Sequence, residues 1–156
     1  MPPVTFTASE TYPSSPDDAF AAVLPAPLPG LFDRRHLALP PITEVRDQHG
    51  DWSTPGETRT IVLSDGATMR ERLVAVRAPH HFDYELGDLT GPLGLVVRRV
   101  EGRWAFEAAG GGTRVTWSWQ VHPRSPLTRP AVLVVRAMWN GYARLGLQRV
   151  GQLLAP

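Results

Sequence analysis

The chain of 156 residues is long enough for one domain with a sizeable core, and its 42% hydrophobic and 20% charged residues exclude a disordered protein. The formal net charge of +1 is too small to attract nucleic acid, and the absence of cysteine excludes disulfides and thiol chemistry. No apolar stretch approaches the ~20 residues that span a bilayer, and Met1–Phe6 lacks the pattern of a signal peptide. We therefore expect a cytoplasmic monomer or homodimer, without a nucleic-acid partner or stable membrane insertion.

The first forty residues combine one strand with short helical segments. Val4–Tyr12 alternates apolar and polar side chains, which predicts a half-buried strand. Ser15, followed by Pro16 and two aspartates, is typical of a helix start, so we expect a short helix that ends near Val23. The proline-rich segment Leu24–Pro41 allows only one or two helical turns.

Further strands and one long helix follow. Alternating patterns between turn residues predict strands at Ile42–Asp47, Glu57–Leu63, Thr68–Val76, His81–Leu86, Val96–Phe106 and Val115–Val121. A helix is expected over Leu127–Leu154, with an apolar stripe made of Leu127, Ala131, Val134, Val135, Met138, Tyr142, Leu145 and Leu153. This order predicts a single α+β domain over residues 1–156. Its curved antiparallel sheet of about seven strands wraps around the long C-terminal helix, with short helical segments after the first strand.

The hairpin around Ser64-Asp65-Gly66 decides whether two charged residues meet. With a three-residue loop, Arg59 lies opposite Glu71 on the face that carries Ile61 and Met69. We expect an ion pair there, inside the domain or at the rim of a cavity, in which Arg59 keeps Glu71 ionised. A two-residue loop would shift the pairing by one residue and separate the two side chains.

Arg98 is expected on the inward face of its strand, beside Val100 and Trp104. A buried arginine without a partner is costly, so Arg98 should meet Glu71, a ligand oxygen or water. Arg59, Glu71 and Arg98 together have three possible roles: a buried network that holds the sheet together, direct contact with a ligand, or catalysis.

Aromatic residues gather on the predicted inward faces, and they are Phe82, Tyr84, Trp104, Phe106, Trp117, Trp119 and Tyr142. They form either an ordinary core or the wall of a cavity, because apolar ligand sites combine aromatic walls with few polar groups. In the second case the tyrosine hydroxyls are the neutral hydrogen-bonding groups inside. The candidate cavity residues are Arg59, Glu71, Tyr84, Arg98, Trp104, Trp117, Trp119, Met138 and Tyr142. The histidines lack the spacing of a metal site, so no metal or cofactor is expected.

Motifs over nearly the whole chain point to one group of proteins. They are Gly56-x-x-Arg59-Thr60, Arg70-Glu71-x-Leu73, Glu101-Gly102-x-Trp104-x-Phe106, Gly112-Thr113-x-Val115-x-Trp117 and Met138-Trp139-x-Gly141-Tyr142. These motifs resemble the SRPBCC superfamily, also called the START-like or polyketide cyclase/dehydrase and lipid transport group. The resemblance implies the helix-grip fold with an internal cavity. The basic residues are all Arg, which suggests a bacterium with a GC-rich genome.

The expected function is the binding or transport of a small hydrophobic or amphipathic molecule, such as a lipid, isoprenoid or polyketide-like compound. An aromatase/cyclase-type enzyme that uses the same cavity is the alternative, and Glu71 is the one inward carboxylate that it could use as acid or base. A protein-interaction module is a second alternative, which would need an exposed apolar patch.

Overall fold

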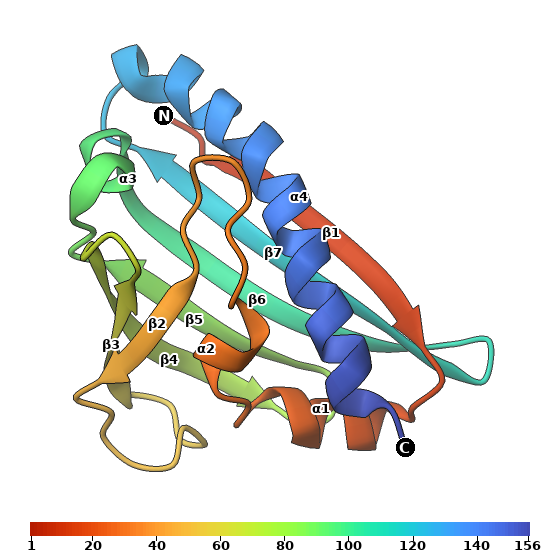
Figure 1. Ribbon diagram of the computed structural model, residues 1–156. Helices are drawn as coiled ribbons and strands as arrows, with labels where there is room; N and C mark the ends of the chain where they lie inside the picture. Colours follow the sequence, from red (N-terminus) through yellow and green to blue (C-terminus); the bar gives the residue numbers. More distant parts are fainter.

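The computed structural model describes residues 1–156 as one seven-stranded antiparallel sheet that curves around a long helix (Figure 1). The elements in chain order are β1 (Val4–Tyr12), α1 (Pro16–Val23), α2 (Leu28–Leu31), β2 (Ile42–Arg46), β3 (Thr58–Leu63), β4 (Thr68–Arg77), β5 (His81–Gly87), α3 (Gly91–Val96), β6 (Val97–Ala109), β7 (Gly112–Pro123) and α4 (Arg129–Leu154). This architecture confirms the α+β helix-grip fold.

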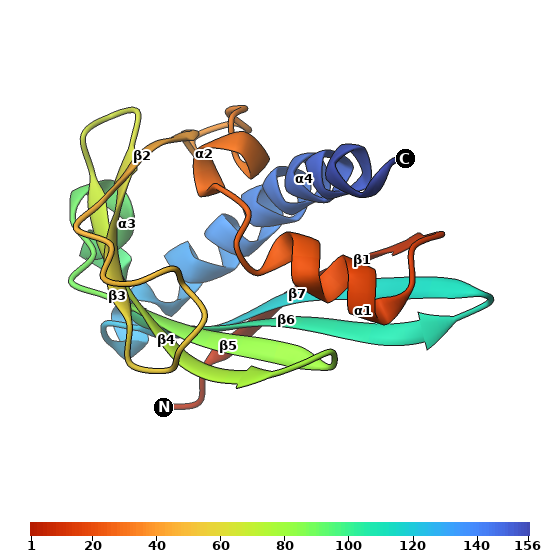
Figure 2. The same ribbon diagram turned by 90° about the horizontal axis from the view of Figure 1, so that it is seen from below.

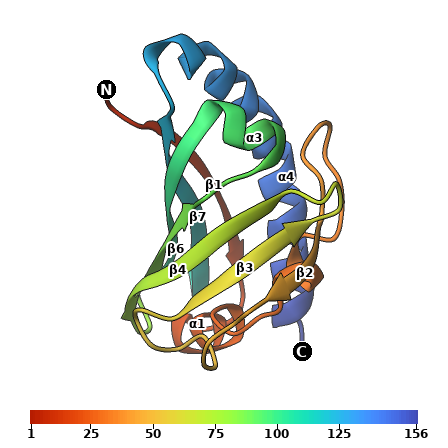
Figure 3. The same ribbon diagram turned by 90° about the vertical axis from the view of Figure 1, so that its left-hand side faces the viewer.

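The sheet has the order β1-β7-β6-β5-β4-β3-β2, so the chain crosses from one edge to the other between the first and second strands. That crossing segment carries α1 and α2, which lie with α4 on the same face of the sheet (Figure 2). Seen from the side, β2, β3 and β4 pass in front of α4 (Figure 3). Register shifts in β2, β4 and β6 bend the strands, and such bulges give a sheet its curvature. The concave face that results holds the core.

The local signals at the helix start and the hairpin are confirmed. The Ser15 side chain accepts a hydrogen bond from the backbone N–H of Asp18 at 3.1 Å, which caps α1. The backbone N–H of Leu63 donates to the carbonyl of Ala67, so the hairpin has the three-residue loop. Gly66 takes the left-handed conformation that this loop requires, with φ of 87°. None of the helices is long and apolar enough to cross a membrane.

The apolar stripe expected on α4 is confirmed at Tyr142 and Val135, which line the cavity, and is wrong at Leu127, Val134 and Leu153, which are exposed. Leu127 is 91% exposed in a 3₁₀ turn before the helix, and Val134 is 62% exposed. The residues that α4 buries are Val132, Trp139, Tyr142, Ala143, Gly146, Leu147 and Val150. Valine, leucine and alanine occur on nearly every side of this helix, so several stripes fit the 3.6-residue period equally well. Contact with the sheet and the crossing segment decides which one is buried.

Candidate ligand-binding cavity

A cavity of about 80 Å³ lies between α4, the concave face of the sheet and the crossing segment. Of its 24 lining residues, 21 are hydrophobic, and the only charged ones are Arg59 and Glu71. The part of the crossing segment that follows α1, Leu24–Pro41, contributes seven of these residues and is called the lid below. Such a cavity, with apolar walls and a few polar groups, is typical of sites for small apolar molecules.

Arg59 and Glu71 form a buried ion pair at one wall of the cavity. They face each other across β3 and β4, and Arg59 Nε donates to Glu71 Oε1 at 2.6 Å. Arg59 is 5% and Glu71 3% exposed. The guanidinium also lies over the ring of Trp52, 3.8 Å from its centroid, and its Nη1 is 3.5 Å from Gln48 Oε1. Protein groups thus contact Arg59 at Nε, at Nη1 and on the face of the guanidinium, and Trp52 of the loop before β3 covers it.

Glu71 is less completely satisfied than its partner. Burial raises the pKa of the Glu71 carboxyl above its ordinary value of 4.5, and the charge of Arg59 and its hydrogen bond oppose this shift. The sequence predicted that Arg59 keeps Glu71 ionised, whereas burial outweighs Arg59 and shifts the pKa of Glu71 upward. Its Oε2 accepts no hydrogen bond from the protein, and the residue lines the cavity.

Tyr84 sits at the centre of a hydrogen-bonded cluster on the sheet. Its hydroxyl oxygen accepts hydrogen bonds from Trp117 Nε1 at 2.7 Å and Trp119 Nε1 at 2.8 Å. The ring reaches these partners by lying across Gly102 of β6, where an added Cβ would come within 2.1 Å of the Tyr84 Cζ. Burial, and after it the charge of Glu71, raises the pKa of Tyr84, so its hydroxyl keeps its proton. That proton has no acceptor in the protein.

The indoles of the cavity wall pack against one another. Trp104 and Trp117 stack with centroids 5.2 Å apart, and Trp139 of α4 lies 4.6 Å from Trp117 and 5.7 Å from Trp119. Trp139 is 1% exposed, and its Nε1 has no hydrogen-bond partner. The sequence analysis missed it as a cavity residue. Its spacing from Ala143, four residues on, within the buried stripe of α4 is the signal that identifies it.

The lid is fastened to α4 by both aromatic and polar contacts. Phe32 stacks on Tyr142 with centroids 5.6 Å apart and planes 6° from parallel. The Tyr142 hydroxyl donates to the carbonyl of Pro40 at 3.1 Å, so its proton is used within the protein.

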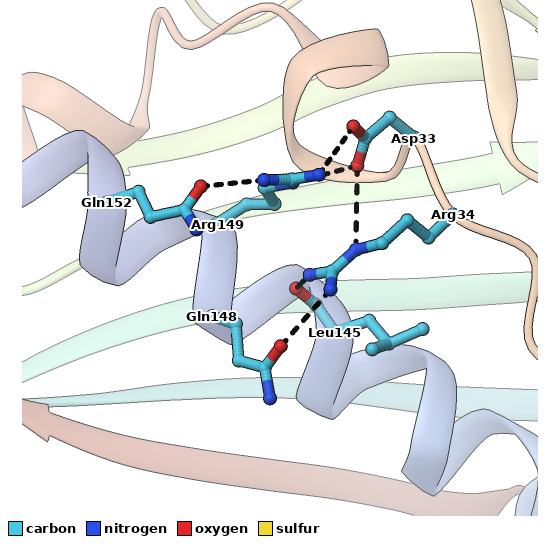
Figure 4. A network of polar contacts seen from close by, with 6 residues as sticks. All are labelled: Asp33, Arg34, Leu145, Gln148, Arg149 and Gln152. Carbon is cyan, nitrogen blue, oxygen red and sulfur yellow. Dashed lines mark hydrogen bonds and ion pairs between the residues drawn. The ribbon is translucent and has the colours of Figure 1, made fainter.

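The polar fastening is shown in Figure 4. Arg149 Nε and Nη2 each donate to Asp33 at 2.9 Å, and Arg34 Nη2 donates to the carbonyl of Leu145 at 2.9 Å. These contacts hold the lid against α4.

The structure brings together seven of the nine candidate residues, namely Arg59, Glu71, Tyr84, Trp104, Trp117, Trp119 and Tyr142. Arg98 is the first exception: it is exposed, because a bulge between Val97 and Arg99 breaks the alternation that was expected to turn it inward. Met138 is the second exception. It is half-buried and does not line the cavity, because α4 turns Trp139 and Val135 toward it instead.

The sequence matches the profile of the family described as polyketide cyclase / dehydrase and lipid transport, over residues 3–155. The chain belongs to this family. No curated protein matches the sequence. The family and the helix-grip fold both fit a domain that binds a hydrophobic ligand.

Solved structures with the same fold come from plants among other sources. Ara h 8.0201 has a TM-score of 0.70 at 20% identity, with 98% of this chain and 99% of that chain covered. The ginseng major latex-like protein 151 from Panax ginseng has a TM-score of 0.69 at 13% identity, with 98% of each chain covered. Norcoclaurine synthase from Thalictrum flavum, solved in complex with dopamine and hydroxybenzaldehyde, has a TM-score of 0.72 at 15% identity, with 97% of this chain and 86% of that chain covered. At these identities the likeness establishes the fold alone.

Proposed function

We propose that this protein binds a small hydrophobic or amphipathic molecule, such as a lipid, isoprenoid or polyketide-like compound, in the cavity between α4 and the sheet. The observation that carries the proposal is the apolar cavity, because close-packed protein interiors leave few voids larger than a water molecule. The aromatic wall supplies large apolar contact area, and the few polar groups supply orientation.

The size of the cavity sets a condition on binding. A volume of about 80 Å³ is smaller than the ~150 Å³ apolar cavity that holds benzene in an engineered protein. A ligand larger than benzene therefore enters only if the lid or the cavity side chains move. The lid is the element suited to this movement, since it is a connection held to α4 by a handful of contacts.

Two neighbouring valines of α4 provide a matched test of the cavity. Val135 lines it, whereas Val134 is exposed on the other side of the helix. Val135→Phe adds bulk inside the cavity and should weaken binding of the neutral dye N-phenyl-1-naphthylamine about tenfold or more, while Val134→Phe leaves its affinity unchanged. Dye fluorescence titrations measure both. A parent protein that does not bind the dye, or equal affinities in the two variants, would contradict the proposal.

An aromatase/cyclase-type enzyme in the same cavity is the second candidate, and Glu71 is the observation that favours it. A buried carboxyl with a raised pKa and one free oxygen at a cavity wall is suited to proton transfer. Incubation with poly-β-ketone substrates should then give ring-closed products that Glu71→Gln fails to form. If Glu71→Gln still forms them, this role of Glu71 is excluded.

A further inference from the structure

Two hydrogen-bond donors of the cavity wall have no acceptor in the protein. The Tyr84 hydroxyl uses its oxygen to accept from Trp117 and Trp119, which leaves its proton undonated. The buried Nε1–H of Trp139 has no partner either, and this indole packs against the same two tryptophans. A buried donor without an acceptor destabilises the protein, because it has lost its hydrogen bond to water without gaining another. A ligand that supplies an acceptor recovers that free energy.

The remaining polar groups restrict the charge of this acceptor. Arg59, the one cationic residue at the cavity, is paired with Glu71, lies over Trp52 and is 3.5 Å from Gln48, so an anionic ligand would have to compete with Glu71 for it. The Glu71 carboxyl lies at the same cavity, and in its ionised form it would repel a ligand carboxylate or phosphate. A neutral acceptor avoids both costs.

We propose that the ligand of this cavity is a neutral carbonyl compound, a ketone or aldehyde on an apolar frame, whose oxygen accepts the hydrogen bond of Tyr84. This inference rests on the proposed binding function and deepens it. Tyr84 is the specificity-determining residue. Its two indole partners strengthen it as a donor, because hydrogen bonds in a chain polarise one another. Gly102 is the positioning residue that lets the ring reach them.

Three probes of equal size isolate the carbonyl. Acetophenone, cumene and 1-phenylethanol have the same number of non-hydrogen atoms and differ in carrying a carbonyl oxygen, a methyl group or a hydroxyl. Calorimetric titration gives the affinity of each for the parent and for Tyr84→Phe. The deciding quantity is the affinity of acetophenone divided by that of cumene. This ratio is compared between the parent and Tyr84→Phe, because the cost of desolvating the ligand carbonyl is the same in both.

We expect this ratio to be about tenfold higher in the parent than in Tyr84→Phe, since the variant leaves the ligand oxygen without its donor. Tyr12→Phe is the matched control: its buried hydroxyl donates to the carbonyl of Leu147 and does not line the cavity. Its ratio should equal that of the parent. The carbonyl stretch of bound acetophenone, measured by infrared difference spectroscopy, should lie at lower frequency in the parent than in Tyr84→Phe.

Each failure has its own signature. If the parent binds none of the three probes, the proposed function fails together with the inference. If it binds them with the same acetophenone-to-cumene ratio as Tyr84→Phe, the proposed binding function is supported and the assignment of a carbonyl ligand is contradicted. A parent that prefers 1-phenylethanol to acetophenone would also overturn it. Should Tyr84→Phe fail to fold, Gly102→Ala replaces it, because the added Cβ displaces the Tyr84 ring and should lower the same ratio.

Discussion

At the scale of single residues, the ion pair of Arg59 and Glu71 shows how local register places chemistry in a cavity. The three-residue loop closed by Gly66 sets the two side chains opposite each other. The register does not determine which groups surround the pair. Trp52, which covers the guanidinium, comes from a loop outside the sheet. Burial by that loop and by the lid raises the pKa of Glu71 against the attraction of Arg59. Desolvation and Coulomb attraction therefore act in opposite directions on the ionisation of Glu71.

The pH dependence of stability tests which of these two effects dominates. A carboxyl with a raised pKa in the folded state contributes stability that is complete below its ordinary value of 4.5 and is lost as the pH rises through the raised pKa. Glu71→Gln cannot ionise. We therefore expect the free energy of unfolding of the parent, relative to Glu71→Gln, to fall as the pH rises above 4.5.

Denaturant unfolding at a series of pH values measures this difference. The exposed carboxyls Asp33, Glu44 and Glu101, whose pKa values are lowered by arginine or histidine neighbours, are present in both proteins and cancel. A relative stability that instead rises with pH would show that Arg59 holds the pKa of Glu71 below its ordinary value.

At the scale of elements, the lid and α4 form the side of the cavity opposite the sheet. The Phe32 stack and the Tyr142 hydrogen bond lie inside, and the Asp33–Arg149 pair lies outside at the surface. Exposed ion pairs contribute only about 0–1 kcal/mol to stability. The outer contact can therefore control how often the lid opens without deciding whether the protein folds.

Asp33→Asn tests this division of roles. The variant should melt within a few degrees of the parent, while the dissociation rate of N-phenyl-1-naphthylamine rises up to about fivefold, the factor that 1 kcal/mol allows. Stopped-flow fluorescence measures the rate. Glu44→Gln is the matched control, because it removes an exposed pair with Arg46 of the same 2.9 Å length that does not touch the lid. Equal rates in parent, Asp33→Asn and control would show that the outer contact does not gate the cavity.

At the scale of the whole molecule, α4 is the longest of the helices that cover the concave face of the sheet, beside α1 and α2 (Figures 1 and 2). It buries Trp139 against Phe6, Trp117 and Trp119, and Leu147 receives the Tyr12 hydroxyl at its carbonyl. At about 25 cal/mol per Å² of apolar surface, losing this cover removes several kcal/mol or more. Domains of this size have only about 5–15 kcal/mol of stability in total.

A chain that ends at Pro126 should therefore show no cooperative thermal transition by differential scanning calorimetry. The control is removal of Ala155 and Pro156 alone, which are exposed and should leave the melting temperature unchanged. A sharp transition in the long truncation would mean that the sheet is stable without α4.

The seven strands, the helices α1 and α4 and their order follow from local sequence patterns, which also favoured the three-residue hairpin that pairs Arg59 with Glu71 over the two-residue alternative; α3 was not predicted. These depend on neighbours a few residues apart, so alternation, turn residues and helix caps report them directly. Only the tertiary structure decided which stripe of α4 is buried, that a bulge turns Arg98 outward, and that Trp139 rather than Met138 reaches the cavity. It also decided that Tyr84 crosses Gly102 to join Trp117 and Trp119. These features arise from contacts between segments far apart in the chain, where several local patterns are equally permissible and close packing selects one.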